Sequence, residues 1–82
     1  MRVQVLDISR NLFSGAFTDT GLNALPLLRL LDLSSNELSG SILDFSDNLV
    51  LERMDLSQNR LLGSISDKFQ NNTMQLDVSE NE

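Results

Sequence analysis

The segment Leu-Leu-Asp-Leu-Ser-Ser-Asn at 30–36 occurs in four related copies along this chain of 82 residues. The other copies are Val-Leu-Asp-Ile-Ser-Arg-Asn at 5–11, Arg-Met-Asp-Leu-Ser-Gln-Asn at 53–59 and Gln-Leu-Asp-Val-Ser-Glu-Asn at 75–81. Their final residues, Asn11, Asn36, Asn59 and Asn81, are 25, 23 and 22 residues apart. A repeat of this length predicts a solenoid, in which each coil buries its apolar side chains against its neighbours.

Within each copy apolar and polar residues alternate, and a period of two is typical of a short strand. In the second copy Leu31 and Leu33 are expected to face the core, while Asp32 faces outward. Regular recurrence places these strands side by side in one parallel sheet. The returning segments are irregular, and we expect short helical turns or 3₁₀ pieces there, limited by Pro26 before the second strand. A single array of three to four coils over residues 1–82 accounts for the chain.

The repeated asparagine is expected to turn into the coil. A buried amide is costly unless it is paired, but it both donates and accepts hydrogen bonds, so a column of amides can pair the backbone of successive coils. Glycines follow at 15, 40 and 63, where they permit backbone angles that other residues avoid. Further apolar side chains are expected to complete the core from the returning segments: Phe17, Ile42, Phe45, Ile65 and Phe69.

Composition excludes several classes of function. The net charge is −6, and the six basic residues are scattered, so nucleic acid is not an expected partner. An acidic surface is also repelled by anionic membranes, and no apolar run is long enough to span one. The chain has no Cys and no His, which removes disulfides, thiol chemistry and histidine bases. We expect no cofactor and no enzymatic activity.

The pattern resembles the leucine-rich repeat family. The continuations Leu-Ser-Gly-Ser-Ile at 38–42 and Leu-Leu-Gly-Ser-Ile at 61–65 are similar to the plant-type repeats of receptor-like proteins, receptor kinases and inhibitors of secreted hydrolases. The proline that usually follows the isoleucine is replaced by Leu43 and Ser66. The resemblance implies an α/β repeat solenoid with a short parallel β-sheet on its concave face and irregular or 3₁₀ segments on its convex face.

The resemblance also implies ligand contacts on the concave sheet, at outward positions that differ between copies. These candidate partner-binding residues are Val5, Arg10, Arg29, Leu30, Ser35, Glu52, Arg53, Gln58, Gln75 and Glu80. They mix apolar, basic, acidic and neutral polar groups, and a mixture of this kind suits a protein or peptide ligand. The alternative is that some or all of them simply face solvent.

A column of aspartates, Asp7, Asp32, Asp55 and Asp77, is expected on the same sheet, with about 5 Å between neighbours. Four carboxylates in a row suggest a cation site or an acid–base cluster. The same slot commonly holds Asp in the family that the chain resembles, and a serine two residues further on offers a hydroxyl partner each time. We therefore expect a scaffold role, with neither a metal site nor catalysis.

Three functional settings remain open. The leading hypothesis is recognition of a protein or peptide as part of a receptor-like protein or receptor kinase; the second is an inhibitor of a secreted hydrolase. The third is self-association or docking, because no terminal cap is evident and both sheet edges are expected to be open. We expect this chain to be a fragment of a longer protein whose further repeats pack against it. Its location is extracellular if the parent is receptor-like, and otherwise cytoplasmic.

Overall fold

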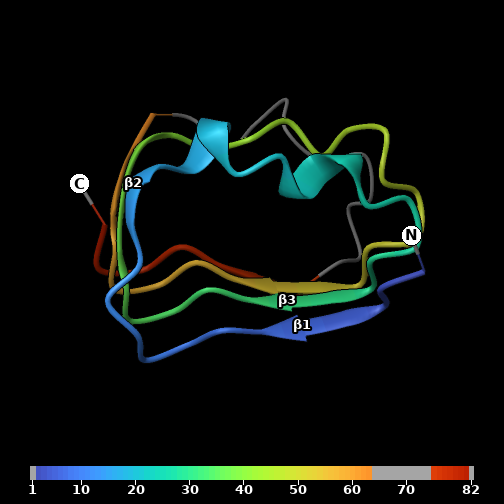
Figure 1. Cartoon of the computed structure of the whole chain (residues 1–82), viewed down its shortest axis with the longest axis horizontal. Helices are drawn as coiled ribbons and strands as arrows, with labels where there is room; N and C mark the ends of the chain where they lie inside the picture. The colour runs from blue at the N-terminus through green and yellow to red at the C-terminus, as the bar shows by residue number, and fades with distance from the viewer. Residues whose placement is uncertain (1, 64–74, 82) are drawn as a thin grey trace.

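The computed structural model describes residues 2–63 and 75–81, which wind in successive coils around a common core (Figure 1). One strand from each coil contributes to a parallel sheet along one side, here called the main sheet. In spatial order its strands are β1 (Val5–Asp7), β3 (Leu30–Asp32), β5 (Arg53–Asp55) and β7 (Gln75–Asp77). The coils that contain these strands are called coils 1, 2, 3 and 4 in the same order. Equivalent residues of the repeat are directly paired. The predicted parallel sheet is confirmed.

A second parallel sheet, here called the lateral sheet, was not predicted. It consists of β2 (Ser14–Ala16), β4 (Glu37–Ser41) and β6 (Arg60–Leu62), and it forms the side wall of the coils next to the main sheet (Figure 1). Gly15 and Gly40 lie inside these strands with φ of 97° and 79°, and Gly63 follows β6 with φ of 96°. These are angles that glycine adopts without steric cost. The sequence interpretation expected unusual backbone angles at these glycines but not the strands that contain Gly15 and Gly40.

The described returning segments lie opposite the main sheet (Figure 1). The segment at 43–50 contains turns, and the predicted segment at 66–72 lies outside the described residues. The first returning segment contains two short 3₁₀ helices, η1 (Phe17–Asp19) and η2 (Leu22–Ala24), as expected. The second ends two residues before Pro26, as expected for a residue that lacks a backbone N–H. Phe17 and Phe45 are buried here with ring centroids 6.0 Å apart. Two predicted core residues, Ile65 and Phe69, lie outside the described residues.

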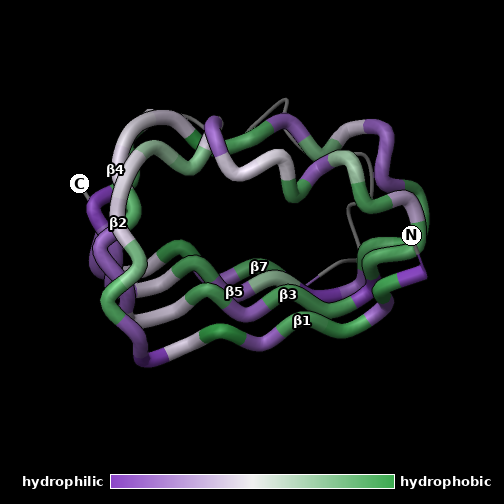
Figure 2. The backbone as a smooth tube through the Cα atoms, viewed as in Figure 1, coloured by the Kyte–Doolittle hydropathy of each residue, from purple (hydrophilic) through white to green (hydrophobic). Residues whose placement is uncertain are grey.

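Leucines fill the core at equivalent positions of successive coils, and hydrophobic and hydrophilic residues alternate along the main-sheet strands (Figure 2). Coils 2 and 3, which have a neighbour on each side, bury these positions completely; they contribute Leu28, Leu31, Leu33, Leu51, Met54 and Leu56. Coils 1 and 4 have one described neighbour, and their core residues Val3, Leu6, Ile8, Leu76 and Val78 are half-buried. Burial of one coil therefore depends on its two neighbours.

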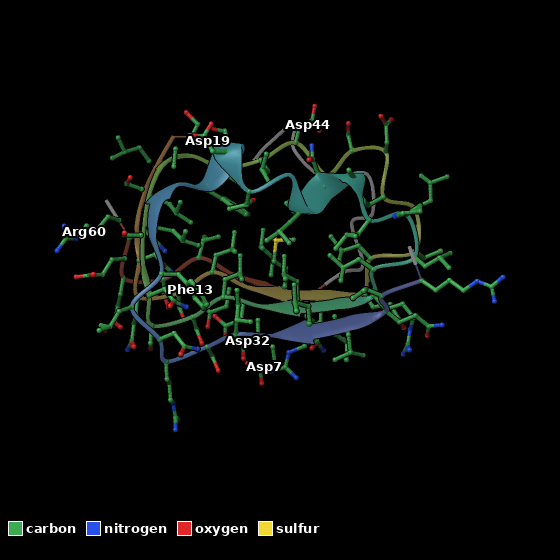
Figure 3. The ribbon with its side chains drawn as sticks, in the orientation of Figure 1. Asp7, Phe13, Asp19, Asp32, Asp44 and Arg60 are labelled. Carbon is green, nitrogen blue, oxygen red and sulfur yellow. The ribbon has the colours of Figure 1, made fainter. Side chains whose placement is uncertain are left out.

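Phe13 shows the effect of position most clearly. It occupies the slot of Leu38, which is 4% exposed, yet its own side chain is 49% exposed. Figure 3 shows Phe13 within the outline of the coil, so it points inward but lies at the outer edge of coil 1. The sequence pattern correctly assigned Phe13 to an apolar position of the repeat. Its side chain is nevertheless far more exposed than those of Leu38 and Leu61 at the equivalent positions.

Asparagine amides connect each coil to the one before it. Asn59 is buried; its Nδ2 donates to Leu33 C=O at 2.9 Å and to Leu56 C=O at 3.2 Å, and its Oδ1 accepts from Leu38 N–H at 3.0 Å. Asn36 and Asn81 repeat this arrangement one coil earlier and one coil later. The predicted column of paired amides is confirmed.

Replacement of Asn59 by alanine should destabilise the protein far more than replacement of Asn11. The Asn59→Ala change removes buried bonds to Leu33, Leu38 and Leu56, and a buried donor left unpaired, here Leu38 N–H, alone costs about 1–3 kcal/mol. We expect urea denaturation to show a loss of about 3 kcal/mol or more for Asn59→Ala. The bonds of the Asn11 amide are exposed, so Asn11→Ala should cost less than about 1 kcal/mol. Equal losses would contradict a structural role for the buried column.

Candidate functional site

The candidate partner-binding residues fall into three columns that run across the coils. The first position of the strands supplies Val5, Leu30, Arg53 and Gln75, which are paired in register. The residue before β3 and the one before β5 supply Arg29 and Glu52, and the turn after each strand supplies Arg10, Ser35, Gln58 and Glu80. The fold thus arranges the ten residues in three columns across the coils, although their part in binding stays a prediction.

A shallow hollow of about 200 Å³ lies over strands β1, β3 and β5 of the main sheet. Val5, Leu30 and Arg53 line it from the first column. The aspartate column lines its other side with Asp7, Asp32 and Asp55. A second hollow of about 170 Å³ continues past Arg53 toward Gln75. An apolar floor therefore adjoins both a row of carboxylates and a guanidinium.

Val5 is the most accessible apolar group of this surface, at 56% exposed, and Leu30 beside it is half-buried. Asp7 and Asp32 point away from the core on the outer face of the main sheet, whereas Asp19 and Asp44 lie on the opposite side of the molecule (Figure 3). The sequence interpretation had selected Val5 and Leu30 for this surface but had treated the aspartates as scaffold alone. The period of two had already placed the aspartates on the same face as the first column, but the two columns were not combined into one site.

Each aspartate of the column is held by the serine two residues further on. In coil 2, Asp32 Oδ1 accepts a bond from Ser34 N–H at 3.0 Å and another from Ser34 Oγ–H at 2.6 Å. Coils 1, 3 and 4 show the same two bonds. The expected serine partners are confirmed. Within the described residues the other carboxylate oxygen, Oδ2, takes part in none of these bonds.

Hydrogen bonding to a carboxylate favours its charged form. The bond from Ser9 Oγ–H, with that from Ser9 N–H next, lowers the pKa of Asp7 below its usual value, and nearby Arg10 adds to this. At the other end of the column, Ser79 N–H and then Ser79 Oγ–H lower the pKa of Asp77. Both groups therefore stay charged to a lower pH than an ordinary aspartate does. The described residues contain no group of three or more acidic side chains arranged to hold a metal ion.

The turn column has a distinct backbone conformation. Arg10, Ser35, Gln58 and Glu80 have φ of 57–58°, in the left-handed region that residues other than glycine seldom adopt. The N–H of Arg10, Ser35 and Gln58 donates to the next coil, as from Ser35 to Ser57 C=O at 3.0 Å. Ser35 Oγ–H also donates to Gln58 Oε1 at 2.5 Å. Side chains of this column therefore contact one another between coils 2 and 3.

Two of the candidate residues, Arg29 and Glu52, form an ion pair with each other. Arg29 Nε and Glu52 Oε2 form an ion pair at 2.5 Å across coils 2 and 3, and Arg29 also approaches Gln4 Oε1 at 3.5 Å. Both side chains are about half exposed, so the pair contributes at most about 1 kcal/mol to stability. Arg53 has no ion-pair partner among the described residues, which leaves its guanidinium available to a ligand.

The described residues contain no helix long and apolar enough to cross a membrane. Their parallel strands, stacked coils and paired asparagines define a repeat solenoid whose sheet displays different side chains on a uniform backbone. Two consecutive segments, 27–49 and 50–72, match the family model described as Leucine Rich Repeat. These two segments cover more than half of the chain, and the chain therefore belongs to the leucine-rich repeat family. No curated protein and no solved structure matches the chain.

Repeats of this family typically serve as scaffolds for protein interaction, which is the general class of the present chain, and they are typically non-catalytic. The match covers the repeat units, and it agrees with the predicted solenoid. It does not identify a ligand.

The low pKa of Asp77 should appear as acid-dependent stability. An unfolded aspartate has a pKa of about 3.9. Because the folded pKa is lower, the stabilisation is complete above about pH 4 and is lost as the pH falls through the folded value. Asp77→Asn retains an oxygen acceptor but cannot titrate, so its unfolding free energy should fall less steeply below about pH 4. Urea titrations across this range measure the slope, with Asp19→Asn on the opposite side as the charge control. An unchanged slope for Asp77→Asn contradicts the assignment.

Proposed function

We propose that the outer surface of the main sheet binds a short, extended polypeptide that carries apolar and basic side chains. The observation that carries the proposal is the hollow in which Val5 and Leu30 adjoin the carboxylates of Asp7, Asp32 and Asp55. Membership of the leucine-rich repeat family, whose repeats typically bind proteins, also supports the proposal. The partner chemistry is inferred from the residues of the hollow.

The apolar part of the hollow favours a ligand side chain at its centre. Val5 is exposed in the absence of a ligand, and removing apolar surface from water contributes about 25 cal/mol per Å². An aliphatic or aromatic side chain on Val5 and Leu30 therefore acts as the anchor. Anchors of this kind, at the centre of a contact, dominate the affinity of most interfaces.

The carboxylates favour a cationic neighbour to that anchor. Asp7 and Asp32 are paired in register on adjacent strands, as are Asp32 and Asp55, and like charges in this arrangement repel one another. The Oδ1 atom of each aspartate accepts bonds from serine. The Oδ2 atom takes part in none of these bonds within the described residues and can accept a bond from a ligand. A Lys or Arg of the peptide placed over the column relieves the repulsion. Arg53, on the other side, can donate to peptide carbonyl groups.

The size of the sheet limits the length of peptide that binds. Strands lie about 4.8 Å apart, so the four strands span about 14 Å, the length of about four extended residues. A contact of this size lies at the low end for specific recognition, and we expect an affinity in the micromolar range.

The same surface serves both settings implied by the resemblance, a receptor-like protein or receptor kinase and an inhibitor of a secreted hydrolase. In each, these repeats provide recognition, and any catalytic activity resides elsewhere. Sequencing the full-length transcript separates the two settings. A membrane span or kinase encoded after the repeats supports the receptor, whereas a stop codon after a terminal coil supports the inhibitor.

Selection of short random peptides against the 82-residue chain tests the proposed surface. Selected peptides should contain a Lys or Arg next to an apolar residue. Arg53→Ala and Val5→Ala should each weaken their binding about tenfold, the usual effect of truncating an anchor residue. Fluorescence polarisation with a labelled peptide measures the dissociation constant.

Two residues of the lateral sheet provide matched controls. Arg60 is an exposed arginine like Arg53, and Leu62 at 48% exposed resembles Val5. Arg60→Ala and Leu62→Ala should bind the selected peptides as the wild type does. Equal weakening by the control substitutions, or an absence of enriched peptides, contradicts the proposed site.

A further inference from the structure

Arg53 lies on β5, in the interior of the main sheet, at the boundary between the two hollows. It pairs in register with Leu30 on one neighbouring strand and with Gln75 on the other. Of the described residues that line either hollow, Arg53 alone is cationic. The groups around Arg53 are therefore supplied by strands on both sides of it, and they determine what its guanidinium can bind.

Arg53 and Asp55 carry opposite charges on the same face of β5, two residues apart, but no ion pair joins them among the described residues. Asp55 Oδ1 instead accepts bonds from Ser57 N–H at 3.0 Å and from Ser57 Oγ–H at 2.6 Å. Because Ser57 follows Asp55 in the chain, these bonds draw the carboxylate away from Arg53. Arg53 is exposed and Asp55 is partly exposed, so both charges are available to a ligand.

A carboxylate is the group that the guanidinium of Arg53 binds best. Arginine has a planar fork of donors that matches the two oxygens of a carboxylate, and such charge-assisted bonds are about twice as strong as those to a neutral carbonyl. Arg29, another of the candidate residues, binds a carboxylate in this way, from its Nε to Glu52 Oε2 at 2.5 Å. An acidic side chain of a bound peptide gives Arg53 the partner that the described residues do not provide.

The spacing of an extended peptide determines which of its residues reaches Arg53. Side chains on one side of an extended chain recur about 6.6 Å apart, whereas neighbouring strands lie about 4.8 Å apart. A peptide that crosses the strands with an apolar residue over Leu30 places its next side chain on that side about 2 Å past β5, beside Arg53. The residue between these two points the other way, over Asp32 and Asp55.

We propose that the main sheet recognises a three-residue motif in which a basic residue lies between an apolar and an acidic one, in either chain direction. The motif rests on the peptide binding proposed above and adds an acidic position to it. The apolar side chain packs on Leu30, and the acidic one pairs with Arg53. The basic side chain lies over the aspartate column, so that charges of peptide and sheet are complementary at each position.

Arg53 is the residue that determines the acidic position of this motif. All the other charged residues that line the hollows, within the described part of the chain, are aspartates. If Arg53 had no charge, a peptide carboxylate at this position would face only Asp55 and Asp77, and like charges placed together across an interface are unfavourable. The aspartates thus select the basic residue, and Arg53 selects its acidic neighbour.

Three fluorescent peptides with blocked ends test the acidic position. They have the same flanking residues and contain Leu-Arg followed by Glu, Gln or Arg. Fluorescence polarisation with the 82-residue chain at about 0.15 M salt measures each dissociation constant. The peptide with Glu should bind about tenfold more tightly than the peptide with Arg, and the peptide with Gln should lie between them. The net charge of −6 by itself favours the opposite order, so this order reports the local contact.

Substitution of Arg53 should change this order of affinities. Arg53→Glu should invert it, so that the peptide with Arg binds most tightly, and Arg53→Gln should abolish the advantage of the peptide with Glu. Arg60→Glu is the matched control, because it makes the same change of charge at an exposed arginine of the lateral sheet. It should retain the order of the wild type, and circular dichroism checks that each variant retains its fold.

A fourth peptide, with Ala in place of Leu beside Arg-Glu, separates the motif from the peptide site on which it rests. Weaker binding of this peptide, together with equal affinity for the peptides with Glu, Gln and Arg, retains the site and overturns the motif. Inversion of the order by Arg60→Glu as well as by Arg53→Glu assigns the effect to net charge and also overturns the motif. If none of the four peptides binds, both proposals are wrong.

Discussion

The structure depends on the requirement that a polar amide buried in an apolar stack be fully paired. The buried Asn36 and Asn59 meet it by bonding to the preceding coil as well as to their own, and the half-buried Asn81 makes the same set of bonds. Each amide thereby sets the distance and register between two coils, because a displaced coil would leave both a donor and an acceptor unpaired. Regular leucine packing and regular strand pairing follow from this alignment. The outer columns inherit the same spacing, which makes the sheet a uniform support for different side chains.

Local sequence and neighbouring coils contribute differently to this order. The Asp–Ser bonds and the left-handed turn residues form within a single copy of the repeat. Burial of the leucines, by contrast, requires a coil on each side, as the contrast between Leu31 and Leu6 shows. A solenoid of this kind gains stability from contacts between units more than from each unit alone.

The periodic features of the chain could be predicted from its sequence, and features that need exact geometry could not. Alternation around Leu31-Asp32-Leu33 was enough to orient the strand, and alignment of the copies on their asparagines was enough to align Val5 with Leu30. The lateral sheet has no alternating pattern, and its glycine-containing strands carry the features of a turn. The pairing of Arg29 with Glu52 depends on the side-chain conformations of two exposed residues, which a pattern does not specify. The hollow was missed because it combines a column read as ligand-binding with one read as scaffold.

The positive φ of the turn column restricts how this surface can be diversified. The four copies carry Arg, Ser, Gln and Glu there, so charge and length vary freely, but none of the four is branched at Cβ. Valine, isoleucine and threonine are disfavoured at such angles because the second Cβ substituent crowds the main chain. A combinatorial library built on this scaffold should therefore randomise the first strand column with all residue types and restrict the turn column to unbranched ones, including asparagine and glycine.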